Sequence, residues 1–108
     1  MTPDLRVVRE QIFGPVGVLT TSTDMDEAIP QADDTEYGLA ASVWTTNLTT
    51  AHLMAAGIQA GTVWIDTWAE QGNNALPFGG YEQSGIGREG GLEVFDAHTQ
   101  SKTVLIAL

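Results

Sequence analysis

Apolar and polar positions follow one another along the chain in short blocks that predict strands separated by helices. Residues 16–21 (VGVLTT) are apolar and β-branched, which is typical of a strand. Residues 41–45 (ASVWT) and 62–66 (TVWID) have the same character, and the second block is apolar enough to predict a central strand. A final block at residues 102–108 (KTVLIAL) predicts a strand that closes the chain.

Between the first three blocks the apolar residues take helical spacing. Asp24 is the predicted N-cap of a first helix, with Glu27 as its capping-box partner. Pro30 costs ~3 kcal/mol inside a regular helix, so this helix is predicted to be short, to be kinked or to start later than its cap. Asn47 is the predicted N-cap of a second helix, with Gly61 as its stop. The apolar face of the second helix consists of Leu48, Ala51, Ala55 and Ile58.

The rest of the chain is predicted to alternate between turns, a long loop and one more helix. Residues 37–38 are predicted to close a turn, and the glycine-rich residues 67–87 predict a loop of a length that usually serves a site or contacts a partner. A short helix is predicted over residues 88–98, with Leu92 and Phe95 facing inwards. The order β-α-β-α-β-loop-α-β predicts an α/β layer with parallel strands, which the last strand need not join.

Composition and charge narrow the classes of partner. The chain has 108 residues, enough for one domain, and a net charge of -10 with no Lys or Arg between Arg9 and Arg88. Nucleic acid and anionic membranes are therefore excluded as partners. No stretch approaches the ~20 apolar residues of a membrane span, and the start at Met1 lacks the features of a signal peptide. We expect a cytoplasmic protein whose charge reflects solubility or a salty habitat.

The residue types that usually carry chemistry are scarce. The sequence contains no cysteine, which excludes disulfides, thiolate metal sites and a cysteine nucleophile within these residues. His52 and His98 are far apart in sequence and have no neighbouring ligand pattern. The acidic runs at residues 24–27 and 33–36 lack the EF-hand spacing. No metal site and no catalytic residue are predicted.

Four segments carry a resemblance to a known family. They are residues 9–16 (REQIFGPV), 37–45 (YGLAASVWT), 61–66 (GTVWID) and 77–89 (PFGGYEQSGIGRE). In this order and at this spacing they resemble the C-terminal segment of the catalytic domain of the NAD(P)-dependent aldehyde dehydrogenase superfamily, and the likeness covers essentially the whole chain.

The resemblance implies a fold and an assembly. It implies an α/β fold of the aldehyde dehydrogenase C-terminal type, with parallel strands alternating with helices. Residues 1–108 would form a single partial domain, and residues 100–108 would form an oligomerisation strand available for pairing with another subunit. A homo-oligomer is therefore expected.

The resemblance also implies roles for four side chains. Gln11 stands where the family has a glutamate that holds the hydroxyls of the nicotinamide-side ribose of NAD or NADP, and an amide both donates and accepts there without charge. Phe13 matches a phenylalanine near the nicotinamide ring. Phe78 and Trp68 match walls of the aldehyde pocket. The alternatives are a polar surface residue for Gln11 and hydrophobic packing for the three aromatic residues.

Two positions depart from the family pattern. The family commonly has asparagine where Asp66 stands and lysine where Glu82 stands. Asp66 would introduce a charge close to a buried site, and Glu82 would reverse one.

The resemblance implies oxidation of aldehydes to acids through a thiohemiacetal on a cysteine, followed by hydride transfer to NAD or NADP. Because the cysteine and the cofactor-binding half are missing from this sequence, the isolated chain is expected to be inactive and to bind no cofactor. Two hypotheses follow. The chain is a piece of an enzyme that works with a complementary dehydrogenase fragment, or it is a standalone, non-catalytic oligomerising or regulatory module that reuses the fold.

Overall fold

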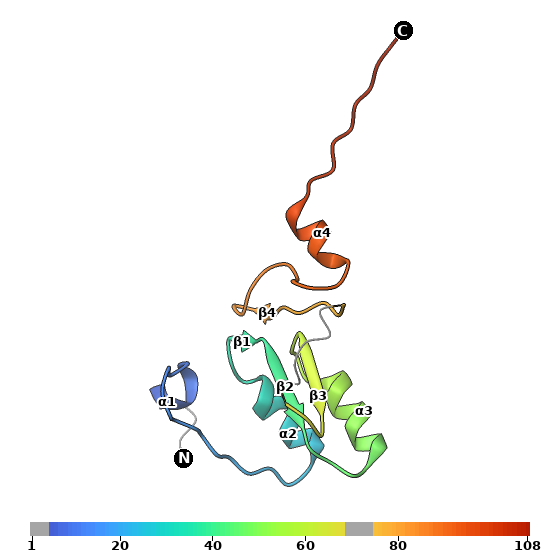
Figure 1. The fold of residues 1–108 in the computed structure, drawn as a ribbon. Helices are drawn as coiled ribbons and strands as arrows, with labels where there is room; N and C mark the ends of the chain where they lie inside the picture. Colours follow the sequence, from blue (N-terminus) through green and yellow to red (C-terminus); the bar gives the residue numbers. More distant parts are fainter. Residues whose placement is uncertain (1–4, 69–74) are drawn as a thin grey trace.

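A computed structural model describes residues 5–68 and 75–108 as four short helices and four short strands (Figure 1). Residues 1–4 and residues 69–74, which are part of the predicted loop, lie outside the described residues. The helices are α1 (Arg6–Arg9), α2 (Met25–Asp33), α3 (Leu48–Gly57) and α4 (Glu93–His98). The strands are β1 (Tyr37–Gly38), β2 (Ala40–Val43), β3 (Thr62–Ile65) and β4 (Tyr81–Glu82).

A β-α-β unit forms the centre of the molecule. Strands β2 and β3 pair in parallel, from Ala40 opposite Thr62 to Val43 opposite Ile65. Helix α3 connects the two strands and packs on both, and α2 packs on α3 (Figure 1). The predicted parallel pair is therefore present. Within the described ranges β3 has only this one neighbour and is partly buried, so the prediction of a central strand is wrong for the chain by itself.

Both predicted helix starts are found, because capping depends on residues close in sequence. The carboxylate of Asp24 accepts the N–H of Glu27 at 3.0 Å. In a capping box the Glu27 side chain would accept the N–H of the cap residue, Asp24. Here it accepts the N–H of Thr23 instead, at 2.8 Å. Helix α2 continues through Pro30 and is only nine residues long, so the alternative of a later start is wrong. The side chain of Asn47 caps α3 through the N–H of Thr50 at 3.1 Å.

The end of α3 differs from the prediction. The helix ends at Gly57, and Ile58 follows as its C-cap with its N–H on the carbonyl of Met54. Gly61 is therefore not the helix stop, and it begins the approach to β3 instead. On the predicted apolar face Ala51 and Ile58 are buried, whereas Leu48 is exposed.

Several predicted elements lack the neighbours they require. Residues 16–21 and 102–108 are extended but form no ladder among the described residues, because a strand needs a partner for its backbone groups. Residues 37–38 form β1, antiparallel to β4, rather than a turn. Leu92 and Phe95 flank or lie in α4 with exposed side chains, so their predicted inward orientation is wrong.

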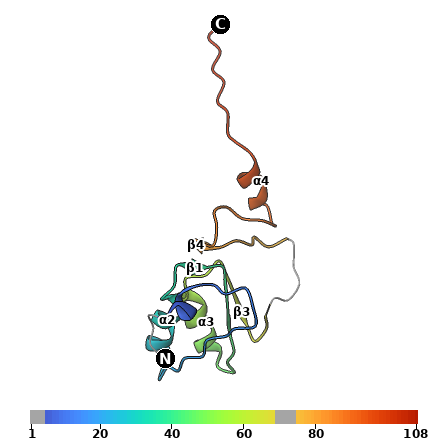
Figure 2. The same cartoon turned by 90° about the vertical axis from the view of Figure 1, so that its left-hand side faces the viewer.

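The molecule is elongated and has little interior. Its extents are 70 × 34 × 26 Å, and its radius of gyration of 18.2 Å exceeds the ~13 Å of a compact 100-residue domain. Residues 99–108, called here the tail, extend away from the rest of the molecule with no other segment beside them (Figures 1 and 2). The buried apolar side chains among the described residues are Val43, Ala51 and Ile58.

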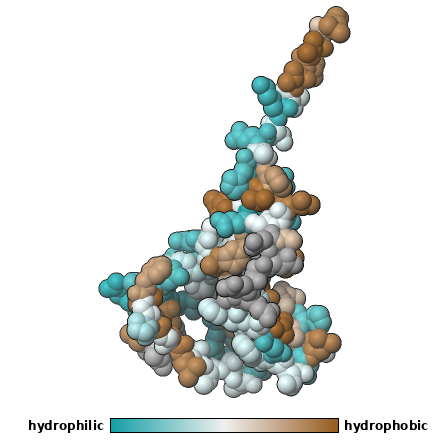
Figure 3. All heavy atoms as spheres, viewed as in Figure 1, coloured by the Kyte–Doolittle hydropathy of each residue, from teal (hydrophilic) through white to brown (hydrophobic). Residues whose placement is uncertain are grey.

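The exposed area gives a measure of this openness. The chain exposes 8920 Å², whereas a compact monomer of its mass of 11.5 kDa exposes ~5800 Å². Apolar side chains gather along the tail, where Leu105 and Leu108 are almost fully exposed (Figure 3). In the described part of the chain, no helix has the length and apolar character needed to cross a membrane.

Candidate functional site

Trp68 follows β3 at the edge where the carboxyl ends of β2 and β3 meet. Open parallel sheets usually bind their ligands at this edge. The hydroxyl of Ser42 donates to the carbonyl of Thr67 at 2.5 Å. The N–H of Thr45 donates to the carboxylate of Asp66 at 2.8 Å. The chain is thus attached to the end of β2 just before Trp68, whose side chain is 73% exposed.

Phe78 lies on a closed loop. The N–H of Phe78 donates to the carbonyl of Glu89, and the N–H of Glu89 donates to the carbonyl of Phe78, both at 2.7 Å. This pair of bonds closes the loop at residues 78 and 89. Inside it, one guanidinium nitrogen of Arg88 donates to the carbonyls of Gly80 at 3.1 Å and Gly87 at 2.8 Å. The loop therefore holds Phe78 through its own bonds, although the side chain is still 41% exposed.

The loop is seated on the β-α-β unit by close backbone approach. The N–H of Gly38 donates to the hydroxyl of Ser84 at 2.9 Å, and the N–H of Gly61 donates to the carbonyl of Gly38 at 3.0 Å. A Cβ on Gly61 would overlap the carbonyl oxygen of Gly79 and lie 2.8 Å from its carbon. Only a residue without a side chain fits between β3 and the loop, so Gly61 positions the loop that carries Phe78.

A hollow of about 410 Å³ lies between this loop and α4. Its wall combines Phe78 and Leu39 with the loop glycines, Arg88 and His98. Gln11, Phe13 and Trp68 do not line it. Of the four side chains predicted for the site, Phe78 is the one that lines this hollow.

Gln11 and Phe13 lie on the extended arm that follows α1. Gln11 is exposed, and Phe13 is 96% exposed. A dinucleotide site also requires backbone N–H groups that hold the pyrophosphate, usually at a helix N-terminus after a strand. Neither Gln11 nor Phe13 lines the hollow beside Phe78, and both residues are open to water, so the arm alone does not enclose a dinucleotide.

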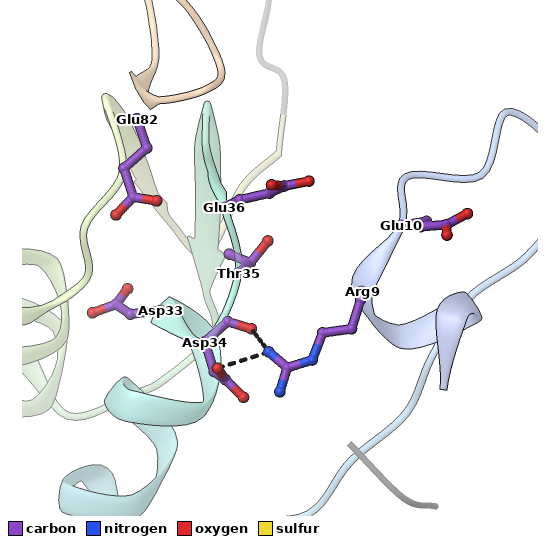
Figure 4. Close-up of a pocket in the computed structure, with 7 residues that line it drawn as sticks. All are labelled: Arg9, Glu10, Asp33, Asp34, Thr35, Glu36 and Glu82. Atoms are coloured by element: carbon purple, nitrogen blue, oxygen red, sulfur yellow. Dashed lines mark hydrogen bonds and ion pairs between the residues drawn. The ribbon is translucent and has the colours of Figure 1, made fainter. Parts of the chain in front are cut away.

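The arm is attached to the body at an acidic hollow of about 490 Å³ (Figure 4). The guanidinium of Arg9 donates to the carbonyl of Asp34 at 2.9 Å and pairs with its carboxylate at 2.7 Å. The bond from Arg9 lowers the pKa of the Asp34 carboxyl below 3.8. The remaining wall is Glu10, Asp33, Thr35, Glu36 and Glu82. Within the described ranges, no three acidic or histidine side chains are grouped closely enough to hold a metal ion.

Replacing Arg9 with glutamine is expected to raise the pKa of Asp34 back towards 3.8, because the charge-assisted bond is lost. The lowered pKa means that the contact stabilises the docked arm above pH 3.8 and is lost as the pH falls through the lowered value. An NMR titration of the Asp34 carboxyl carbon measures this. Arg6→Gln is the matched control, because Arg6 pairs with Glu10 at 2.7 Å and lowers the pKa of that residue instead. An Asp34 pKa that does not move in Arg9→Gln would show that the arm is not docked in this way.

Three residues that organise the site were not identified from the sequence. Arg88, Ser84 and Ser42 act through bonds to backbone atoms that are distant in sequence or hidden within a loop. The glycine density of residues 79–87 indicated a loop, but no pattern indicated which carbonyls Arg88 would bind.

Comparison with known proteins gives a consistent result. The model of the aldehyde dehydrogenase family matches residues 1–104. An aldehyde dehydrogenase from Bacillus cereus, solved as its NAD+ complex, is 48% identical over 93% of this chain, with a TM-score of 0.86. An indole-3-acetaldehyde dehydrogenase from P. syringae, a mutant in complex with NAD+ and IAA, is 45% identical over 100% of the chain, with a TM-score of 0.88. This chain covers 20% and 22% of those two chains, or about a fifth of their length.

A third solved structure extends the range of substrates named among the similar proteins. It is a gamma-glutamyl-gamma-aminobutyraldehyde dehydrogenase from Burkholderia cenocepacia, 52% identical over 87% of this chain, with a TM-score of 0.83. This chain covers 19% of it.

Proposed function

The chain belongs to the aldehyde dehydrogenase family, and on that premise we propose that it is the C-terminal part of the catalytic domain of an oxidoreductase that converts aldehydes to acids. The observation that carries the proposal is the family match over residues 1–104, together with 48% identity to a solved aldehyde dehydrogenase. The NAD+ complexes among the similar structures favour NAD over NADP as the oxidant.

The proposed enzyme requires a second polypeptide segment. Aldehyde oxidation through a covalent intermediate needs a nucleophile that forms and breaks a bond to carbon, and these 108 residues contain no cysteine. We propose that a complementary dehydrogenase fragment supplies the cysteine and the cofactor domain. By itself the chain is then inactive.

The four site residues become functional together in that assembly. Gln11 bonds a ribose hydroxyl, Phe13 packs near the nicotinamide ring, and Phe78 and Trp68 form walls of the aldehyde pocket. The near-complete exposure of Phe13 and the 73% exposure of Trp68 support this proposal, because a large aromatic side chain left in water gains free energy when a partner covers it. The seated loop gives Phe78 a defined position before assembly.

The surface of the chain also favours assembly. It exposes 8920 Å² where a compact monomer of the same mass exposes ~5800 Å², an excess of ~3000 Å² on this chain alone. Counted over both partners, an interface that covered this excess would bury ~6000 Å², which is the scale of an obligate interface. Part of this area lies on the tail, where an extended apolar segment offers unpaired backbone groups. We propose that residues 100–108 pair with a second subunit in a homo-oligomer.

Mixing the chain with a complementary fragment tests the function. The fragment is the Bacillus cereus relative, truncated before the segment that matches this chain. We expect the mixture to form NADH from NAD and an aldehyde, and neither part alone to do so. A fragment whose nucleophilic cysteine is replaced by alanine is the control, and it should form the complex without activity. The absence of both a complex and NADH from the mixture would contradict the proposal.

A second candidate function follows from α3. Its last turn carries Ala55, Ala56 and Gly57, where members of the family often have arginine or lysine, and Leu53 on the same helix is 51% exposed. In a standalone oligomerising or regulatory module, small uncharged residues at these positions would allow another protein surface to pack closely against the helix. Such a module would form a stable homo-oligomer that ignores the complementary fragment in sedimentation experiments, which distinguishes it from the enzyme segment.

A further inference from the structure

We propose that Asp66 is a positioning residue for the aldehyde pocket, because it fixes the chain between β3 and Trp68 to the end of β2. The effect on the pocket rests on the proposed function. The attachment itself, called here the Asp66 clamp, comprises the bonds of Asp66 to Val43 and Thr45 and can be tested in the chain alone.

The clamp holds Asp66 through both its backbone and its side chain. The N–H of Asp66 donates to the carbonyl of Val43 at 2.8 Å, which extends the parallel ladder by one bond. The carboxylate accepts the N–H of Thr45, also at 2.8 Å. Between these bonds the backbone has a φ of 53°, in the left-handed region that aspartate and asparagine tolerate better than other residues with a Cβ. The sheet therefore ends at a defined residue, and the chain turns there.

The bonds around the clamp transmit this position in two directions. Towards the pocket, the hydroxyl of Ser42 holds the carbonyl of Thr67, and Trp68 is the next residue. Towards α3, the hydroxyl of Thr45 accepts the N–H of Asn47 at 3.1 Å, and Asn47 caps the helix. Loss of the Asp66 carboxylate would release the N–H of Thr45 and remove the side chain that favours the turn before Trp68.

The charge of Asp66 is compatible with this role. The sequence suggested a charge close to a buried site, but in the chain Asp66 is exposed to water, so its carboxylate is not desolvated here. What the clamp uses is an acceptor oxygen on a short side chain and tolerance of a positive φ. An asparagine would provide both, whereas alanine lacks the acceptor and glycine keeps only the backbone freedom.

Amide hydrogen exchange in the chain alone tests the clamp. We expect exchange at the N–H of Thr45 to be about tenfold faster in Asp66→Ala and Asp66→Gly, and close to wild type in Asp66→Asn. The indole N–H resonance of Trp68 should move in the same two variants. Asp66→Gly removes the acceptor without a strained φ, so it keeps the test meaningful if Asp66→Ala fails to fold. Equal Thr45 exchange in all variants would overturn the clamp.

Kinetics of the mixture with the complementary fragment test the positioning role. Asp66→Gly should raise the KM for an aromatic aldehyde on the order of tenfold with a smaller change in kcat, and Asp66→Asn should restore the wild-type KM. Asp96→Ala on the exposed α4 is the matched control and should leave both constants unchanged. An unchanged KM in Asp66→Gly, with altered Thr45 exchange, would overturn positioning of the pocket. A wild-type mixture without activity would contradict the proposed function, and the exchange experiment would still decide the clamp.

Discussion

Replacing Gly61 with alanine is expected to unseat the loop that carries Phe78 and to destabilise the chain by about 3 kcal/mol. The added methyl group would overlap the carbonyl oxygen of Gly79 and lie 2.8 Å from its carbon, and 3.3 Å from the Cα of Gly80. All three atoms belong to the backbone, so no side-chain rotation relieves the overlap. Either the loop or the start of β3 must move, and the bond from Gly61 to Gly38 lies at that contact.

Urea unfolding followed by circular dichroism measures this effect, and Gly17→Ala is the control. A Cβ on Gly17 meets nothing within 4 Å, so that substitution should be neutral or slightly stabilising through its effect on the unfolded chain. The indole N–H of Trp68 and the amide of Phe78 report whether the loop alone has moved. If Gly61→Ala and Gly17→Ala unfold at the same urea concentration, the close approach of Gly61 and Gly79 does not exist in solution.

Introducing aspartate at both Leu105 and Ile106 is expected to weaken self-association by at least about a hundredfold. These side chains are 90% and 75% exposed on a tail that makes no ladder among the described residues. Burying each in an interface is worth roughly 1.5–3 kcal/mol, and a carboxylate at the same place would have to be desolvated without a partner. The chain already carries a charge of -10, so the added charges also increase repulsion between copies.

Sedimentation velocity over a range of concentrations measures the association. Aspartate at Ser22 and Thr46 is the matched control, since it adds the same charge at exposed polar positions outside residues 100–108 without removing apolar surface. A wild-type chain that remains monomeric at high concentration would contradict pairing through the tail. So would a doubly substituted chain at Leu105 and Ile106 that associates as tightly as its control.

Elements fixed by neighbouring residues could be predicted from the sequence. Asp24 and Asn47 cap their helices through bonds to residues only three positions away. The apolar blocks at residues 41–45 and 62–66 predict the ends of β2 and β3 to within two residues. Residues 16–21 and 102–108 have the same β-branched character, yet they pair with no strand in the part of the chain that the structure describes. A strand is completed by another strand, and apolar alternation carries no information about whether that neighbour is in the chain.

The site shows the same division. The glycine-rich loop was predicted from its composition, and the four side chains Gln11, Phe13, Phe78 and Trp68 were predicted from the resemblance, but neither indicated how these residues lie relative to one another. Phe78 is held by the pairing of residues 78 and 89 and by a contact between Gly61 and Gly79, which are 18 positions apart in the sequence. The role of Asp66 depends on a positive φ at the end of a strand. An aspartate in that place is equally compatible with an ordinary surface residue, so composition alone could not identify it.

The small interior of the chain, with Val43, Ala51 and Ile58 as the buried apolar side chains among the described residues, has a consequence for its supply in a cell. In the proposed assembly the folded form is completed by its partner, so its stability rises with partner concentration, by about 1.4 kcal/mol for each factor of ten above the dissociation constant. Copies made in excess of the partner spend more time open and are removed by proteases. The steady amount of this chain would therefore follow the amount of the complementary fragment, and a matched ratio would be maintained by turnover without a dedicated regulator.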